Sequence, residues 1–197
     1  MTWKEFVSGA ASLGVTLDGD QVRAFEVFED RLYAANATIN LTRVPRDDCR
    51  GRHFLDSLSL SPLIPEGASV IDIGSGAGLP GVPLALARPD LRVTLLDAGT
   101  KEIRFLESLA DLVACGLILQ RAEEAGRQAE FRERYDVAVG RALAPLPIQA
   151  ELSAPFVRVG GLFLPQRAEG EDTPSFEVLG LRLRERVTVK GAGIDRL

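Results

Sequence analysis

A glycine-rich stretch that follows an apolar run holds the residues of this chain best suited to contact a nucleotide-like ligand. Gly74, Gly76 and Gly78 stand at every second position, directly after the largely β-branched run Val70–Ile73. Glycine tolerates positive φ and has no Cβ, so such a loop turns sharply and lets a ligand touch the backbone. Strand, glycine loop and a helix starting near Pro80 are typical of a nucleotide-binding βα turn.

The spacing of the glycines separates this loop from a dinucleotide site. Dinucleotide folds prefer G-x-G-x-x-G, whereas this loop reads G-x-G-x-G. Asp72 lies in the strand just before the first glycine, and its charge suits a cationic ligand end, such as the amino acid portion of S-adenosylmethionine. A glycine loop can also be only a tight turn, so the interpretation needs support from the next strand.

A second acidic residue provides that support. Asp97 ends the next apolar segment, Arg92–Asp97, and follows the glycine loop by roughly 20 residues, the spacing of a ribose-binding acid in these folds. The alternative is an acid that caps a helix or stabilises a loop. Given the glycine loop before it, we interpret Asp97 as a ribose contact.

Two further expected strands also end in polar residues. Ala122 and Glu123 follow the third strand, where a backbone N–H and a carboxylate can flank an adenine ring; Glu123 can alternatively cap the next helix. Arg141 ends the fourth strand, where its planar guanidinium can bind a carboxylate or an RNA phosphate. An ion pair between Arg141 and Asp72, or another acid of the site, is compatible with that role.

The elements that must position these residues alternate along the chain. Apolar segments predict strands over 69–73, 92–97, 117–120, 135–140 and 162–165, the last entered by a turn at Gly160-Gly161. Helices are expected over 80–87, 100–114, 123–131 and 146–156. This alternation predicts a doubly wound parallel sheet that binds ligands at the carboxyl ends of its strands. Residues 178–189 alternate in polarity and predict one or two late strands.

The first third of the chain has helical character. Apolar residues recur at helical spacing up to residue 40, with Asp18 or Asp20 as the N-cap, and Asp47 can cap a second helix reaching about Leu60. Turn residues around Pro65 mark a boundary. We therefore expect a helical N-terminal extension over 1–66, packed on a core domain over 67–197.

Composition limits the classes of function. The chain has 197 residues, a 46% hydrophobic content and a net charge of −5, which argues against a sequence-blind nucleic-acid binder. Two distant cysteines, a single histidine (His53) and the lack of a long apolar run predict a cytoplasmic protein without a metal site or a membrane partner. We also expect a monomer that does not bind DNA. A cluster of arginines is either a local basic face or a solvated surface: Arg43, Arg46, Arg50 and Arg52.

Taken together, the motifs resemble the bacterial 16S ribosomal RNA guanine-N7 methyltransferase family, also called glucose-inhibited division protein B. The R-H-F-L-D-S block at 52–57, combined with the loop G-S-G-A-G-L-P-G, is specific, because a generic methyltransferase shares only the glycine loop. The matching segments are Asn40-Leu41-Thr42, Arg52–Leu58, Val70–Asp90, Thr94–Leu106, Arg121–Glu124 and Gly140–Leu146.

The resemblance implies a Rossmann-like class I S-adenosylmethionine-dependent methyltransferase fold. It also implies methyl transfer to N7 of one guanine in the decoding region of 16S ribosomal RNA, at nucleotide 527, either in free RNA or in the small-subunit particle. It places a set of residues at the cofactor: Gly74, Leu79, Asp97, Ala122, Glu123 and Arg141. It places another set on the substrate side: Arg52, His53 and Asp56, with Arg141 beside the target base. A structural histidine is the alternative for His53. The ring nitrogen carries a free lone pair, so the reaction requires alignment rather than a general base.

The chain departs from the family pattern after the fifth strand, where Pro165-Gln166-Arg167 stands in place of the usual Lys-Gly pair. Two other functions therefore stay open. A small-molecule methyltransferase on the same fold would agree with the acidic pI of about 5.1. A non-catalytic RNA-binding module that retains the cofactor pocket would agree with the altered C-terminal region.

Overall fold

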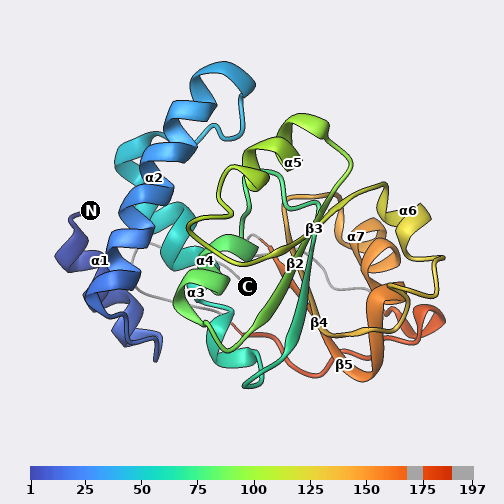
Figure 1. Ribbon diagram of the computed structural model, residues 1–197. Coiled ribbons are helices and arrows are strands. Elements are labelled where there is room, and N and C mark those ends of the chain that lie inside the picture. The colour runs from blue at the N-terminus through green and yellow to red at the C-terminus, as the bar shows by residue number, and fades with distance from the viewer. Residues whose placement is uncertain (168–174, 188–197) are drawn as a thin grey trace.

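The computed structural model describes residues 1–167 and 175–187, and its centre is a five-stranded parallel sheet (Figure 1). The strands are β1 Ser69–Ile73, β2 Arg92–Asp97, β3 Gly116–Leu119, β4 Tyr135–Arg141 and β5 Val157–Gln166. They lie in the order β3-β2-β1-β4-β5, so the chain moves outward from β1 and then crosses back to β4. The β1–β4 boundary is the switch point at which doubly wound sheets bind ligands.

Helices cover both faces of this sheet. They are α1 Trp3–Ser12, α2 Gly19–Ile39, α3 Asp56–Leu58, α4 Gly81–Ala87, α5 Thr100–Glu107, α6 Ala122–Ala125 and α7 Leu146–Ser153. Figure 1 shows α1 to α4 on one side and α6 and α7 on the other. Short 3₁₀ helices occupy Arg46–Asp48, Ser61–Leu63, Ala154–Phe156 and Glu177–Leu179, and a π-helix covers Arg50–Leu55.

Because neighbouring residues of a strand point to opposite faces, β1 takes part in two hydrophobic clusters. Val70 packs with the helices on the N-terminal side, and Ile71 and Ile73 pack with the α6–α7 side. Burial on both faces explains why β1 is apolar at every position except Ser69 and Asp72.

The N-terminal helices pack through an aromatic cluster. Phe54 of the π-helix lies 5.1 Å from Phe25 and 5.5 Å from Phe28 of α2, and 5.9 Å from Phe6 of α1, measured between ring centroids. All four rings are fully buried. Asp18, one of the two predicted candidates, is the N-cap of α2. The division of the chain at residue 66 stays a prediction.

Several predicted boundaries are wrong. The segment expected as one helix from Asp47 is a 3₁₀ turn, a π-helix and one α-helical turn, and the side chain of Asp47 caps none of them. The helix expected to reach residue 114 ends at Glu107, because Arg31 binds the Ser108 carbonyl and both carboxylate oxygens of Asp111. The helix expected over 123–131 ends at Ala125, followed by the poor helix former Gly126.

The last expected strands also differ. β5 begins at Val157, five residues before the predicted start, and Gly160-Gly161 lies inside it as an irregularity rather than a turn. Gly160 has φ +79, which a β-bulge accommodates. No strand forms over residues 175–187, where Leu183 is exposed; the rest of the predicted 178–189 segment lies outside the described residues.

None of the helices in the described ranges combines the length and the apolar character needed to cross a membrane.

Candidate active site

The glycine loop is held open by hydrogen bonds to the end of β2. Gly74, Gly76 and Gly78 have φ values of +70, +51 and +82, so all three need the left-handed region that glycine tolerates. The Gly74 N–H donates to the Leu96 carbonyl at 2.8 Å, and the Gly76 N–H donates to Oδ2 of Asp97 at 2.8 Å. A Cβ placed on Gly76 would meet nothing closer than 4.0 Å. The backbone at Gly76 therefore borders open space.

Asp72 places a buried carboxylate beneath this loop. Its Oδ2 accepts from the Gly81 N–H at 2.8 Å, and Oδ1 has no hydrogen-bond partner among the described residues. Burial raises the pKa of Asp72 to about 7, opposed by the Gly81 hydrogen bond and by the positive charge of Arg141. An acceptor left unsatisfied in a fully buried position is costly unless a ligand pairs with it. The site therefore fits a cationic ligand group.

Asp97 lies at the end of β2, as predicted, and joins two loops. Besides binding Gly76, its carboxylate accepts from the Gly99 N–H at 2.8 Å. Gly99 is the N-cap of α5. Asp97 therefore also stabilises a loop, which was the alternative to a ribose contact in the sequence analysis. Each carboxylate oxygen has a second lone pair, so these contacts leave acceptor capacity for a ribose hydroxyl.

The predicted adenine contacts lie after β3. Ala122 is buried and begins α6, and Glu123 is exposed in its first turn, a position the helix dipole favours for an acid. Leu79 is buried beside the glycine loop, and its N–H donates to the Ser75 carbonyl at 3.0 Å. These residues follow the carboxyl ends of β1 and β3, where the ligand is predicted, and the Leu79 N–H is already used within the loop.

Arg141 ends β4 and is nearly buried, with 10% of its side chain exposed. It forms an ion pair with Asp56, whose Oδ2 accepts from Nη1 at 2.9 Å, and not with Asp72. Nη1 also donates to the Arg52 carbonyl at 3.1 Å. The helical block at 52–56 therefore supplies the partners of Arg141, and Asp72 keeps a free oxygen.

His53 is buried against Arg141. Its Nδ1 lies 3.0 Å from Nη2 of Arg141, and its Nε2 lies 2.7 Å from Oγ1 of Thr42. The predicted site residues Arg141, His53 and Asp56 are therefore brought together. Thr42 was identified only as part of a family motif, because no local spacing connects it to His53.

Gln166, at the end of β5, is a second residue of this region whose contact with the helical block was not predicted from the sequence. Its side-chain amide donates to the backbone carbonyl of Asp56 at 2.6 Å. It occupies the segment in which the chain departs from the family pattern, and it ties the last strand to the helical block. Gln166 and Asp56 are 110 positions apart, so no local sequence pattern predicts this contact.

The arginine cluster splits into two kinds of residue. Arg50 binds both carboxylate oxygens of buried Glu29, and Arg46 binds Glu29 and Asp30, so these two arginines hold the extension together. Arg52 is about half exposed and lies 3.6 Å from Asp48. Arg43 is exposed. Only part of the cluster is therefore available to a partner.

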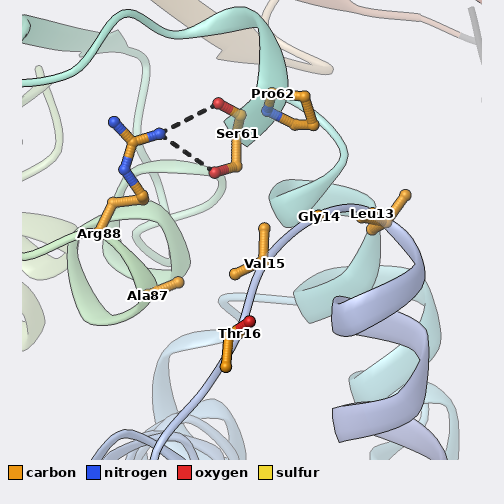
Figure 2. Close-up of a pocket in the computed structure, with 8 residues that line it drawn as sticks. All are labelled: Leu13, Gly14, Val15, Thr16, Ser61, Pro62, Ala87 and Arg88. Carbon is orange, nitrogen blue, oxygen red and sulfur yellow. Dashed lines mark hydrogen bonds between the residues drawn. The ribbon is translucent and has the colours of Figure 1, made fainter.

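A pocket of about 290 Å³ is lined by Ala87 and Arg88, among other residues (Figure 2). These two residues are at the C-terminal end of α4, whereas the glycine loop precedes the start of this helix. Arg88 in this pocket donates to the carbonyl and the hydroxyl of Ser61 and to both carboxylate oxygens of Asp90. Its guanidinium is committed within the protein, so the pocket offers no free charge to a ligand. Its lining residues are Leu13, Gly14, Val15, Thr16, Ser61, Pro62, Ala87 and Arg88.

Within residues 1–167 and 175–187, no group of three or more His, Cys, Asp or Glu side chains is arranged to hold a metal ion.

Similarity to known proteins extends over most of the chain. The family model described as rRNA small subunit methyltransferase G matches residues 21–174. The chain belongs to this family. A relative from Lachnoclostridium phytofermentans, named Ribosomal RNA small subunit methyltransferase G, is 40% identical over 195 residues, covering 93% of this chain and 81% of the relative. The relative of the same name from Caldanaerobacter subterraneus subsp. tengcongensis is 44% identical over 164 residues, covering 80% and 69%.

The fold of this member of the rRNA small subunit methyltransferase G family agrees with a solved structure. A SAM dependent methyltransferase from Aquifex aeolicus matches with a TM-score of 0.52 at 16% identity, over 72% of this chain and 87% of that chain. This match bears on the fold alone. With the sheet order, it confirms the predicted Rossmann-like class I methyltransferase fold, and the family match confirms the predicted methyltransferase activity.

Proposed function

We propose that this member of the rRNA small subunit methyltransferase G family transfers the methyl group of S-adenosylmethionine to N7 of a guanine in 16S rRNA, at nucleotide 527. The observation that carries the proposal is the buried Oδ1 of Asp72, which has no partner among residues 1–167 and 175–187 and lies beneath a glycine loop that borders open space at Gly76. A zwitterionic, sulfonium-bearing nucleoside supplies the positive charge that this oxygen lacks.

The cofactor site runs along the carboxyl edge of the sheet. Asp72 receives the ammonium group, Gly76 contacts the ligand through its backbone, and Asp97 accepts from the ribose hydroxyls. Ala122 and Glu123 flank the adenine ring. When bound, S-adenosylmethionine supplies a methyl group already activated by its sulfonium.

The RNA approaches from the side of the helical block. Arg43 and Arg52 are exposed there and contact phosphates, while Arg46 and Arg50 stay bound to Glu29. Two exposed arginines on an acidic protein, Arg43 and Arg52, the latter in an exposed ion pair with Asp48, give RNA a local basic contact despite the net charge of −5. We propose that the protein acts as a monomer in the cytoplasm on the RNA or on the small-subunit particle.

The residues at the β1–β4 crevice align the reactants and exclude water. Guanine N7 uses its free lone pair, so no side chain has to remove a proton in the transfer. The base becomes cationic as the new bond forms, and an uncompensated arginine nearby would oppose that charge. Asp56 neutralises Arg141 at 2.9 Å, so the pair holds donors near the base without a net positive charge.

The proposal is tested by mass spectrometry of 16S rRNA fragments from cells with and without the gene. We expect N7-methylguanosine at the proposed nucleotide only when the gene is present. Purified protein is then given undermodified small-subunit particles, naked rRNA and labelled S-adenosylmethionine. Asp72→Asn should abolish most of the labelling, and Asp111→Asn, an exposed acid paired with Arg31, is the matched control. An unchanged methylation pattern, or label on small metabolites alone, would overturn the proposal.

A further inference from the structure

We infer that His53, as the neutral imidazole with its proton on Nε2, is a positioning residue that fixes the orientation of Arg141 at the β1–β4 crevice. The inference rests on the proposed function in one respect, namely that Arg141 acts in methyl transfer to guanine N7. The hydrogen-bond geometry, however, can be tested without any methyl transfer.

The tautomer follows from the chemistry of the partners. An arginine guanidinium only donates hydrogen bonds, so the 3.0 Å contact from Nη2 of Arg141 requires Nδ1 of His53 to be an unprotonated acceptor. The proton of a neutral ring then resides on Nε2, which donates to Oγ1 of Thr42 at 2.7 Å. His53 is thus held from both sides in one protonation state.

Thr42 is itself fixed in place. Its hydroxyl oxygen also accepts from the Val44 N–H at 3.1 Å, and its own N–H donates to Oδ1 of Asn36 near the end of α2. The His53–Thr42 contact therefore connects the end of a long helix to the end of β4. Second partners of this kind set which ring nitrogen of a histidine carries the proton.

Arg141 receives three acceptors from one short helical block. These are the Arg52 carbonyl at 3.1 Å, Nδ1 of His53 at 3.0 Å and Oδ2 of Asp56 at 2.9 Å. The π-helical turn at Arg50–Leu55 brings residues 52 and 53 to the guanidinium together with Asp56, and such turns are common at functional sites. Three acceptors in different directions fix the plane of the guanidinium.

The arrangement leaves part of Arg141 available to a ligand. Two N–H groups of Nη1 and one of Nη2 are used, while Nε–H and the second Nη2 N–H have no partner among the described residues. His53 is only 4% exposed, so water does not readily replace its acceptor atom. Loss of that atom would let the guanidinium rotate while Asp56 still neutralises it.

The first experiment reads the tautomer directly. His53 is the only histidine of the chain, so long-range ¹⁵N–¹H correlation of the ¹⁵N-histidine-labelled full-length protein at neutral pH needs no assignment. We expect the Nε2–H tautomer, with Nδ1 unprotonated. An Nδ1–H tautomer, a protonated ring or rapid averaging between tautomers would overturn the inference, whatever the substrate of the enzyme is.

The second experiment separates positioning from folding. His53→Asn retains an acceptor near the position of Nδ1, and His53→Leu removes it. We expect His53→Leu to lower kcat for rRNA methylation roughly 10-fold or more while S-adenosylmethionine affinity by calorimetry stays within about 2-fold, and His53→Asn to recover most of the loss. Equal losses in both variants, or no loss in His53→Leu, would contradict the inference.

A third variant keeps the histidine in place if the substitutions at position 53 fail to fold. Thr42→Val removes the acceptor of Nε2–H with little change in volume. We expect broadened or mixed tautomer signals and a partial loss of kcat. Thr38→Val is the matched control, because Thr38 lies on α2 and its hydroxyl donates only to the Ala35 carbonyl. An unchanged tautomer and an unchanged kcat in Thr42→Val would show that the hydrogen bond between Thr42 and His53 does not fix the ring.

If the wild-type protein methylates no rRNA but shows the Nε2–H tautomer, the proposed function is wrong and the inferred hydrogen-bond geometry is right.

Discussion

Arg141 at the end of β4 donates a 2.9 Å hydrogen bond to Asp56, which lies 85 positions earlier in the chain. The two side chains are 10% and 1% exposed, so this ion pair is shielded from water. It joins the helical block that follows the N-terminal helices to β4, which borders the proposed cofactor site. The sheet and the helical block at 50–58 are therefore held together by a buried ion pair.

The first prediction concerns this ion pair. Asp56→Ala should lower the free energy of unfolding by about 3–5 kcal/mol, because it leaves a buried arginine without its counter-charge. Asp48→Ala removes the partner of Arg52 in an exposed pair at 3.6 Å and should cost less than about 1 kcal/mol. Urea unfolding of both variants measures the difference, and similar costs would show that the Arg141 pair is not buried in solution.

The second prediction concerns pH. Burial raises the pKa of Asp72 from 3.8 to about 7, so the folded state binds this proton more tightly than the unfolded state. The contribution of Asp72 to stability is thus fully present below about pH 4 and is lost as the pH rises through about 7. Asp72→Asn should remove this decline, which amounts to a few kcal/mol. Urea unfolding of the ligand-free protein at pH 5 and pH 8 compares the two proteins, and parallel pH dependence would contradict the assignment.

A third prediction separates backbone strain from ligand contact. Gly76→Ala and Gly14→Ala both place a Cβ at a residue with positive φ, +51 and +78, with room around it. Each should cost about 1–2 kcal/mol of stability. Only Gly76→Ala should weaken binding of S-adenosylmethionine in calorimetry, because only Gly76 borders the proposed crevice. Equal affinities in the two variants would place the ligand elsewhere.

A fourth prediction concerns the acid at the end of β2. Asp97→Ala should weaken S-adenosylmethionine binding by about 1–3 kcal/mol, since a ribose hydroxyl and the N–H groups of Gly76 and Gly99 lose their acceptor. The overall fold should persist, as checked by circular dichroism. Unchanged affinity in calorimetry would show that Asp97 serves only the loops.

The last prediction concerns the RNA-facing arginines. Arg43→Gln should weaken rRNA binding and reduce the slope of log K against log salt by about 1, as expected for one lost phosphate contact. Arg23→Gln changes an exposed arginine of α2 that pairs with Asp20 and should leave the slope unchanged. Filter binding at several salt concentrations provides the measurement, and equal slopes in the two variants would exclude Arg43 from the interface.

Much of the fold was predictable because its signals are local. The apolar runs at 69–73 and 92–97 match β1 and β2 in full, because most of the central positions of both strands are buried apolar residues. Helix ends were less predictable. The end of α5 depends on Arg31, a residue of another helix, and the start of β5 depends on pairing with β4 across a bulge. The sequence around the end of α5 does not indicate the contact with Arg31, and the sequence around the start of β5 does not indicate the pairing with β4.

By itself, the sequence determined the glycine loop, the acids at the ends of β1 and β2, and the family to which the chain belongs, because these follow from residue types at short spacing. Only the tertiary structure decided that Arg141 pairs with Asp56 rather than Asp72, that Arg46 and Arg50 are held by Glu29, and that His53 accepts from Arg141. Such pairings depend on how segments far apart in the chain pack together. A buried charge is costly unless it is paired, so buried Glu29 and Asp56 lie against arginines that tertiary packing brings to them, and no local sequence pattern predicts which arginines these are.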